Sequence, residues 1–253
     1  MLSIVPTLAS LAGCGGVTDR QRVTLRAGEQ AFENKQYDVA RQHLTQFLAE
    51  VKDQPEVGRA LYVRGMASAL GGQRSEAYAD LQRATRVPSD PAIRWQPYLM
   101  LGVLYFEDEN WTAAAQALTE AAARAPETPP KDAIWYRLGL CYERLGRWDE
   151  ALTPYRRIAH GFASGPYAAN AERRLRLRAS NFAVQCGVFT RADNAQQLAR
   201  RLAGQGLKVY VQQEYRGAEV FHVVLEGRYV SYAQAIQALA RVKGHIPEAV
   251  LWP

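Results

Sequence analysis

The spacing of hydrophobic residues divides the chain into a long helical region and a shorter alternating region. Through residues 21–160, apolar side chains recur every three to four positions, the spacing that places them on one face of an α-helix. One such run extends from Trp95 to Glu107 and the next from Trp111 to Arg124, with a short polar break between them. The pattern predicts a series of helical hairpins.

The alternating region begins after Ser180. From Phe182 to Phe189 every second residue is apolar on one face, which is typical of a β-strand. Helices are predicted after Asp193 and after Ser231. Further strands are predicted at residues 207–213, 220–226 and 249–252. The order βαββαβ predicts a small α+β domain of the split-βαβ type, with two helices on one face of a four-stranded sheet.

The alternation also assigns side chains to the two faces of this sheet. The helix-covered face is expected to carry Val184, Val209, Val211, Phe221, Val223 and Leu225. The open face is expected to carry Gln185, Gly187, Tyr210, Gln212, His222 and Val224. Amides, flat rings and a glycine suit a neutral polar polymer such as a glycan.

The helical region repeats with a period of 37 residues. Three columns share this period, namely Gly28, Gly65, Gly102 and Gly139; Ala40, Ala77, Ala114 and Ala151; and Leu44, Leu81, Leu118 and Tyr155. Each copy is predicted to form two helices, and the Gly and Ala columns allow these two helices to approach closely. We therefore expect a large side chain at Gly102 or Ala114 to force its hairpin open.

These columns resemble the tetratricopeptide repeat (TPR), whose pattern contains Trp-x-x-Leu-Gly-x-x-Tyr, a later Ala and a closing Pro. The fourth copy carries Trp135, Leu138, Gly139, Tyr142, Trp148 and Ala151, and the third carries Tyr98, Leu101, Gly102, Tyr105, Trp111, Ala114 and Pro126. The resemblance implies an all-α superhelical solenoid of four units over residues 15–164. It also implies a concave groove for a protein partner, lined by Tyr62, Met66, Leu99, Val103, Phe106, Tyr136 and Leu140. The alternatives are that another part of the chain fills this groove, or that some of these residues belong to the core.

Residues 165–180 are predicted to form a capping helix and a linker. A solenoid of stacked hairpins needs a polar cap at its open end. Tyr167, Ala171 and Leu175 lie at helical spacing, and the rest of the segment carries a basic cluster. The cluster consists of Arg173, Arg174, Arg176 and Arg178. We interpret it as part of the cap, with a surface for an anionic partner or a membrane as the alternative.

Residues 181–253 resemble the SPOR domain, a module of bacterial cell-envelope proteins. The family opens with Val-Gln-x-Gly-x-Phe, which here is Val184 to Phe189, and a later family strand resembles Phe221 to Tyr229. The resemblance implies binding to peptidoglycan glycan strands. The motif and the predicted face together give the glycan-binding candidates Gln185, Gly187, Phe189, Tyr210, His222 and Trp252. For His222, a solvated sheet position is the alternative.

The first fourteen residues carry no charged side chain and end in Leu11-Ala12-Gly13-Cys14. Small residues before a cleavage point are typical of a secretory signal. The four residues resemble the lipobox of bacterial lipoproteins. The resemblance implies a signal peptide at residues 1–14 and lipidation of Cys14, which would anchor the chain in a membrane. A short buried helix with an ordinary cysteine is the alternative.

Composition and charge narrow the choice of partners. The chain is 48% hydrophobic and 22% charged, as globular domains are, and no apolar run reaches the roughly 18–20 residues of a membrane-spanning helix. The formal charge of +6 over 253 residues is modest, and the predicted open face lacks a basic frame, so no nucleic-acid partner is expected. Cys141 and Cys186 are expected to be buried free thiols, and no cofactor or metal is predicted.

No catalytic motif is present in the sequence. The adjacent carboxylates Asp108-Glu109 and Asp149-Glu150 lie at predicted helix boundaries, where capping explains them better than glycan cleavage. We therefore predict a non-enzymatic, lipid-anchored scaffold on the periplasmic side of the bacterial cell envelope, in cell division or wall remodelling. Attachment to the outer membrane is preferred to the inner. The alternatives are an outer-membrane assembly or transport accessory lipoprotein, and a regulator of cell-wall hydrolases or a weak hydrolase.

Overall fold

The computed structural model describes residues 16–87 and 89–253. The predicted signal peptide and Cys14 lie outside these residues. The chain forms two compact units, divided between Pro97 and Tyr98. Within the described ranges, no helix has both the length and the hydropathy that crossing a membrane requires.

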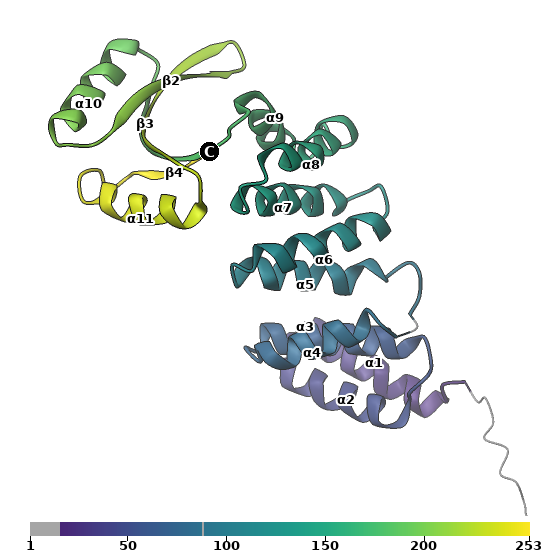
Figure 1. Cartoon of the computed structure of the whole chain (residues 1–253). Coiled ribbons are helices and arrows are strands. Elements are labelled where there is room, and N and C mark those ends of the chain that lie inside the picture. The colour runs from purple at the N-terminus through teal and green to yellow at the C-terminus, as the bar shows by residue number, and fades with distance from the viewer. Residues whose placement is uncertain (1–15, 88) are drawn as a thin grey trace, which may run out of the picture. The chain divides into compact units, whose positions relative to one another are not determined.

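The first unit consists of helices paired as antiparallel hairpins. They are α1 (Asp19–Glu33), α2 (Tyr37–Glu50), α3 (Glu56–Leu70) and α4 (Arg74–Ala84) (Figure 1). A capping box starts α1, because the Thr18 hydroxyl accepts from the Gln21 N–H while the Gln21 side chain accepts from the Thr18 N–H. The core forms around Leu44, Phe47 and Leu61, which are fully buried.

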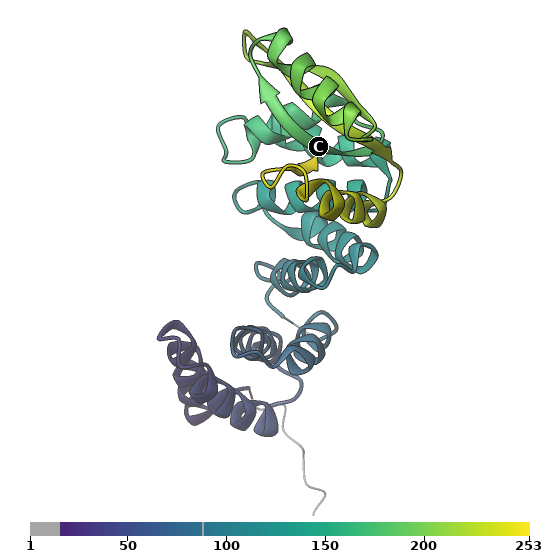
Figure 2. The same cartoon turned by 90° about the vertical axis from the view of Figure 1, so that its left-hand side faces the viewer.

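The helical hairpins continue into the second unit. They are α5 (Trp95–Glu107), which begins just before the division, α6 (Trp111–Arg124), α7 (Lys131–Arg144) and α8 (Trp148–Gly161), followed by the single helix α9 (Ala168–Leu177). Both α5 and α6 begin and end at the predicted residues. The same pairs can be followed by colour in the turned view of Figure 2. The prediction of an all-α repeat region is confirmed.

Close packing within each hairpin explains the repeating glycines. A Cβ atom at Gly28 would lie 2.7 Å from Cγ of Leu44, and one at Gly102 would lie 2.6 Å from Cγ of Leu118. In the fourth repeat, a Cβ atom at Gly139 would lie 2.5 Å from Cε1 of Tyr155. The third sequence column therefore supplies the large residues that fill the space above the glycines. No side chain fits at these glycines without moving its neighbour.

The second unit ends in an α+β domain with a four-stranded antiparallel sheet in the order β2-β3-β1-β4. Its elements are β1 (Phe182–Phe189), α10 (Ala192–Gly204), β2 (Val209–Arg216), β3 (Glu219–Tyr229), α11 (Tyr232–Lys243) and β4 (Val250–Trp252). Leu202 of α10 and Val242 of α11 share one core with Val184 and Val224, so both helices cover the same face. The predicted βαββαβ order is confirmed.

The predicted starts of the two helices have different outcomes. Ser231 caps α11, since its hydroxyl accepts from the Gln234 N–H. The other helix, α10, begins at Ala192, so Asp193 lies inside the first turn instead of capping it. A carboxylate there still favours the helix, because the N-terminal end carries partial positive charge.

Candidate functional site

The candidate site is the face of the sheet turned away from α10 and α11, which we call the outer face. Strand register assigns its members, because paired residues of antiparallel strands project to the same side. Gln185 of β1 and Tyr210 of β2 both pair with Leu225 of β3. The outer face carries Ala183, Gln185, Val188, Tyr210, Gln212, Glu214, Phe221, Val223, Leu225 and Trp252. Two predicted glycan-binding residues, Gln185 and Tyr210, therefore flank one central leucine.

Arginine side chains lie over two rings of this face. The guanidinium carbon of Arg228 lies 4.5 Å from the ring centroid of Tyr210, and that of Arg216 lies 4.8 Å from the ring centroid of Phe221. The expectation that this face lacks a basic frame is therefore wrong, because two arginines flank its aromatic rings. Burial raises the pKa of Tyr210 further above the neutral range. Its hydroxyl, protonated at neutral pH as in any tyrosine, can donate a hydrogen bond.

Trp252, the third predicted glycan-binding residue on this face, is buried. Its side chain is packed against Ala183, Val223 and Leu225, and the residue is 4% exposed. The indole Nε1–H donates a hydrogen bond of 2.6 Å to Oε1 of Glu214. Because Trp252 belongs to β4 and Glu214 to β2, the two edges of the sheet are joined across the outer face.

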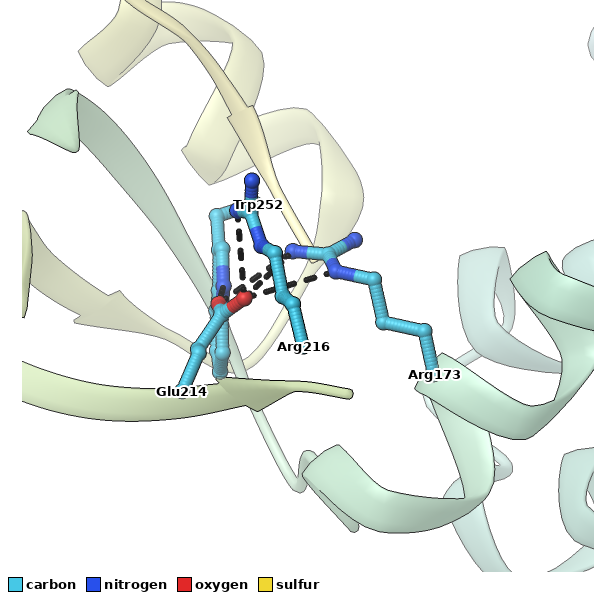
Figure 3. Close-up of polar contacts among 4 residues, drawn as sticks. All are labelled: Arg173, Glu214, Arg216 and Trp252. Atoms are coloured by element: carbon cyan, nitrogen blue, oxygen red, sulfur yellow. Dashed lines mark hydrogen bonds and ion pairs between the residues drawn. The ribbon is translucent and has the colours of Figure 1, made fainter. Parts of the chain in front are cut away.

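Glu214 is the centre of this polar cluster. Its carboxylate accepts from Trp252, from Arg216 of its own strand at 3.4 Å and from Arg173 of α9 at 3.1–3.4 Å (Figure 3). A buried carboxylate is stable only when such donors surround it. Arg173 thus ties the capping helix to the outer face.

The remaining predicted glycan-binding residues lie on the helix-covered face. Gly187 and His222 pair with Val224 and Phe189 respectively, and Phe189 packs in the core beneath α10. A Cβ atom at Gly187 would lie 2.9 Å from Cδ2 of Leu198, a residue of α10. Gly187 therefore admits core side chains, and the expectation that Gly187 and His222 belong to the open face is wrong.

Two features of the sheet explain these errors. A register shift between Gln185 and Gly187 breaks the alternation of β1, so Gly187 changes face. In β3, Val223, Val224 and Leu225 are all fully buried, because both faces of the strand are covered. The sequence assigned Phe221, Val223 and Leu225 to the helix side and Val224 to the open face, and the structure reverses this.

An aromatic cluster that sequence reasoning missed joins the repeats to the α+β domain. The ring of Phe182 lies 4.7 Å from that of Trp148 and 5.7 Å from that of Tyr232. The guanidinium carbon of Arg144 lies 3.9 Å from the Tyr232 ring centroid, and Trp111 contacts the same ring edge-on at 5.7 Å. The sequence signal for this contact is weak. Trp111 and Trp148 begin repeat helices, where the repeat pattern by itself already explains an aromatic residue.

The residues of the predicted protein-binding groove fall in both units. Its members Tyr62, Met66, Leu99, Val103, Phe106, Tyr136 and Leu140 are all half-buried. Tyr62 packs against the core of the first unit, and burial raises its pKa. Tyr136 stacks on Tyr167 with 4.9 Å between ring centroids, so the segment before α9 covers it. Tyr136 is thus part of the core around the capping helix.

The repeats of the second unit contain a cavity that the sequence did not predict. It has a volume of about 610 Å³ and is lined by Tyr98, Tyr105, Tyr142, Arg147 and the small residues of α6. The Ala-rich sequence of α6 leaves this space beside the tyrosine rings. Among residues 16–87 and 89–253, no cluster of His, Cys, Asp and Glu is arranged to hold a metal ion.

Comparison with known families agrees with this architecture. The tetratricopeptide repeat profile matches residues 25–91 and 99–169, which is more than half of the chain, and the SPOR domain profile matches residues 179–252. The chain therefore belongs to the tetratricopeptide repeat family and carries a C-terminal SPOR domain. Both are non-catalytic domain families. The comparison with curated proteins finds no match.

Solved structures of MamA share the fold at low sequence identity. MamA 41-end from Desulfovibrio magneticus RS-1 aligns with a TM-score of 0.52 and 15% identity over 75% of this chain and 92% of that chain. MamA AMB-1 aligns with a TM-score of 0.50 and 21% identity over 63% of this chain and 80% of that chain. At such identities the likeness concerns the fold alone.

Proposed function

We propose that this protein is a non-enzymatic scaffold of the bacterial cell envelope. Its SPOR domain binds peptidoglycan glycan strands, and its tetratricopeptide repeats bind a protein partner. Lipidation of Cys14 anchors it to a membrane on the periplasmic side, and its activity serves cell division or wall remodelling. The match of the SPOR domain over residues 179–252 is the observation that carries the glycan proposal.

The chemistry of the outer face supports a glycan ligand. The amides of Gln185 and Gln212 offer both donors and acceptors to sugar hydroxyls, and the Tyr210 ring offers a flat surface for stacking. Arg216 and Arg228 add donors that suit the carboxylates of a wall glycan. The partner of the repeats is a peptide or protein, because the half-buried positions of their helices are mainly apolar and aromatic.

Sedimentation of the full chain with purified peptidoglycan tests the glycan proposal. We expect the protein to pellet with the wall material, and Gln185→Ala to reduce the bound fraction. Gln196→Ala, on the exposed surface of α10, is the matched control and should bind like the wild type. Amidase treatment of the wall material separates recognition of bare glycan from recognition of stem peptides. If the protein pellets neither with intact nor with amidase-treated peptidoglycan, the proposal is refuted.

A further inference from the structure

We propose that the C-terminal turn of α9 and the linker after it cover the outer face, and that glycan strands bind only after this cover is released. The cover consists of Arg173, Leu177 and Ala179. This inference rests on the proposed function, since it concerns access to the same glycan-binding face. The sequence alone had predicted that this face is open to solvent.

The apolar part of the cover lies on the centre of the outer face. Leu177 and Ala179 pack against Ala183, Val223, Leu225 and Trp252, and these four residues are between 0% and 4% exposed. A sheet face left open to water would expose them. The centre of the face, between the Gln185 and Tyr210 side chains proposed to bind the glycan, is therefore already occupied by the chain itself.

The ionic part of the cover is a contact that can be released without leaving a buried charge unpaired. Arg173 is the only donor to Glu214, among those the structure describes, that comes from outside the α+β domain. When Arg173 leaves, Arg216 and Trp252 still donate to the carboxylate. The Arg173 side chain is 28% exposed and returns readily to water.

The chain around the cover has separate contacts that hold the cap to the repeats. The opposite side of α9 packs through Ala171 and Leu175 against the core of the fourth repeat, and Arg174 pairs with Glu143 of α7. Arg178, which ends α9, has φ = 41° and ψ = 44°, a left-handed conformation that is strained for a residue other than glycine. The Arg173 side chain and residues 177–179 can therefore move while Ala171, Arg174 and Leu175 keep the rest of the cap in place.

A groove beside the cover gives a ligand access to its edge. It has a volume of about 360 Å³ and is lined by Arg173, Arg176, Leu177, Gln212, Gln213, Glu214 and Tyr215. One wall is α9 and the other is β2, which is an edge strand. A glycan that reaches Gln212 through this groove can then compete with Leu177 for the centre of the face.

Binding measurements on the full chain test the cover. If the closed form dominates, the apparent affinity is reduced by the fraction of molecules that are open, so Arg173→Gln with Leu177→Ser should bind peptidoglycan roughly fivefold more tightly or better. Arg200→Gln is the control, because it removes the same charge from an exposed position of α10, on the opposite side of the sheet from the cover. Gln185→Ala added to the double variant should abolish the gain, which separates specific binding from adhesion of a loosened protein.

Hydrogen exchange gives a second readout that a merely structural cover would not move. Addition of glycan to the wild type should speed amide exchange in residues 176–180. Protection of these residues would overturn the proposal, because α9 would then form part of the occupied site. Equal affinity of the double variant and the wild type, with Gln185→Ala still weakening both, would overturn the cover and leave the proposed function standing. Failure of every variant to bind would overturn both.

Discussion

The indole N–H of Trp252 donates a 2.6 Å hydrogen bond to the carboxylate of Glu214, although the two residues lie in strands at opposite edges of the sheet. The tryptophan thus crosses the outer face and lies over the residues in its centre. This contact holds the last strand, β4, to the opposite edge strand of the SPOR domain. It makes Trp252 a residue of the core as well as of the candidate site.

Trp252→Phe should destabilise the domain. Phenylalanine keeps an aromatic ring in the space but removes the donor, so we expect the free energy of unfolding to fall by about 1–3 kcal/mol. Urea unfolding followed by circular dichroism measures the change. Tyr215→Phe is the control, because that side chain is largely exposed and no loss is expected. Equal stability of Trp252→Phe and the wild type would show that the hydrogen bond contributes nothing.

Gly102→Ala should destabilise the third repeat. The new methyl group would lie 2.6 Å from Cγ of Leu118, which is fully buried and has little room to move. We expect the free energy of unfolding to fall by about 1–2 kcal/mol, since overpacking outweighs the higher helix propensity of alanine. In Gly102→Ala/Leu118→Ala, the loss should be smaller than the sum of the single losses.

The control for this substitution lies at the end of α8. A Cβ atom at Gly161 would meet no atom within 4 Å, so Gly161→Ala should leave the thermal midpoint unchanged or slightly raised. A loss at Gly161 as large as that at Gly102 would contradict the packing argument.

Arg174→Gln should expose the cost of a buried carboxylate. Arg174 donates to Glu143 at 2.5 Å, and burial raises the pKa of Glu143 even with that partner present. Removal of the partner should lower the stability at pH 7 by about 3–5 kcal/mol. Arg176→Gln, which breaks an exposed pair, should lower it by less than about 1 kcal/mol.

The loss in Arg174→Gln should depend on pH. Without the arginine, the pKa of Glu143 in the folded chain rises further above its value in the unfolded chain. The folded form then takes up a proton as the pH falls, and neutral Glu143 no longer needs a partner. Unfolding curves at pH 7 and pH 5 should therefore show a smaller difference from the wild type at pH 5. A difference that grows on acidification would refute this account.

The two described cysteines should be unreactive in the folded protein. Burial raises the pKa of Cys141 to about 12 and that of Cys186 to about 11, so almost no thiolate is present at neutral pH. Labelling with a thiol reagent should be slow until denaturant is added. Because the unfolded thiols lose their protons at lower pH than the folded ones, stability should fall as the pH rises above about 9. Rapid native labelling of either cysteine would contradict the burial.

The repeat region shows how far a sequence pattern reaches. Columns at a period of 37 residues placed Gly102 against the second helix of its hairpin, and the structure puts Leu118 of the next column there. Such contacts are local in sequence, so the period of the pattern and the size of the residues are enough to predict them. The helix boundaries at Trp95, Glu107, Trp111 and Arg124 follow from the same local signals.

The sheet shows where the pattern stops. Alternation placed Gln185 and Tyr210 on the outer face, as the strand register does, but it failed for Gly187, where the register shifts, and for Val223 to Leu225, where both faces are buried. Alternation with a period of two predicts the face on which a residue lies only when one face of the sheet is exposed to solvent and the strand pairing has no register shift.

By itself, the sequence determined the repeat architecture, the βαββαβ order and most of the residues that fill each hairpin. Only the tertiary structure decided that Arg173 and Leu177 lie on the outer face, that Trp252 is buried there, and that Phe182, Tyr232 and Arg144 join the two parts of the second unit. The physical reason is that these contacts bring together residues remote in the chain. They depend on how finished elements pack against each other, and no local period records that packing.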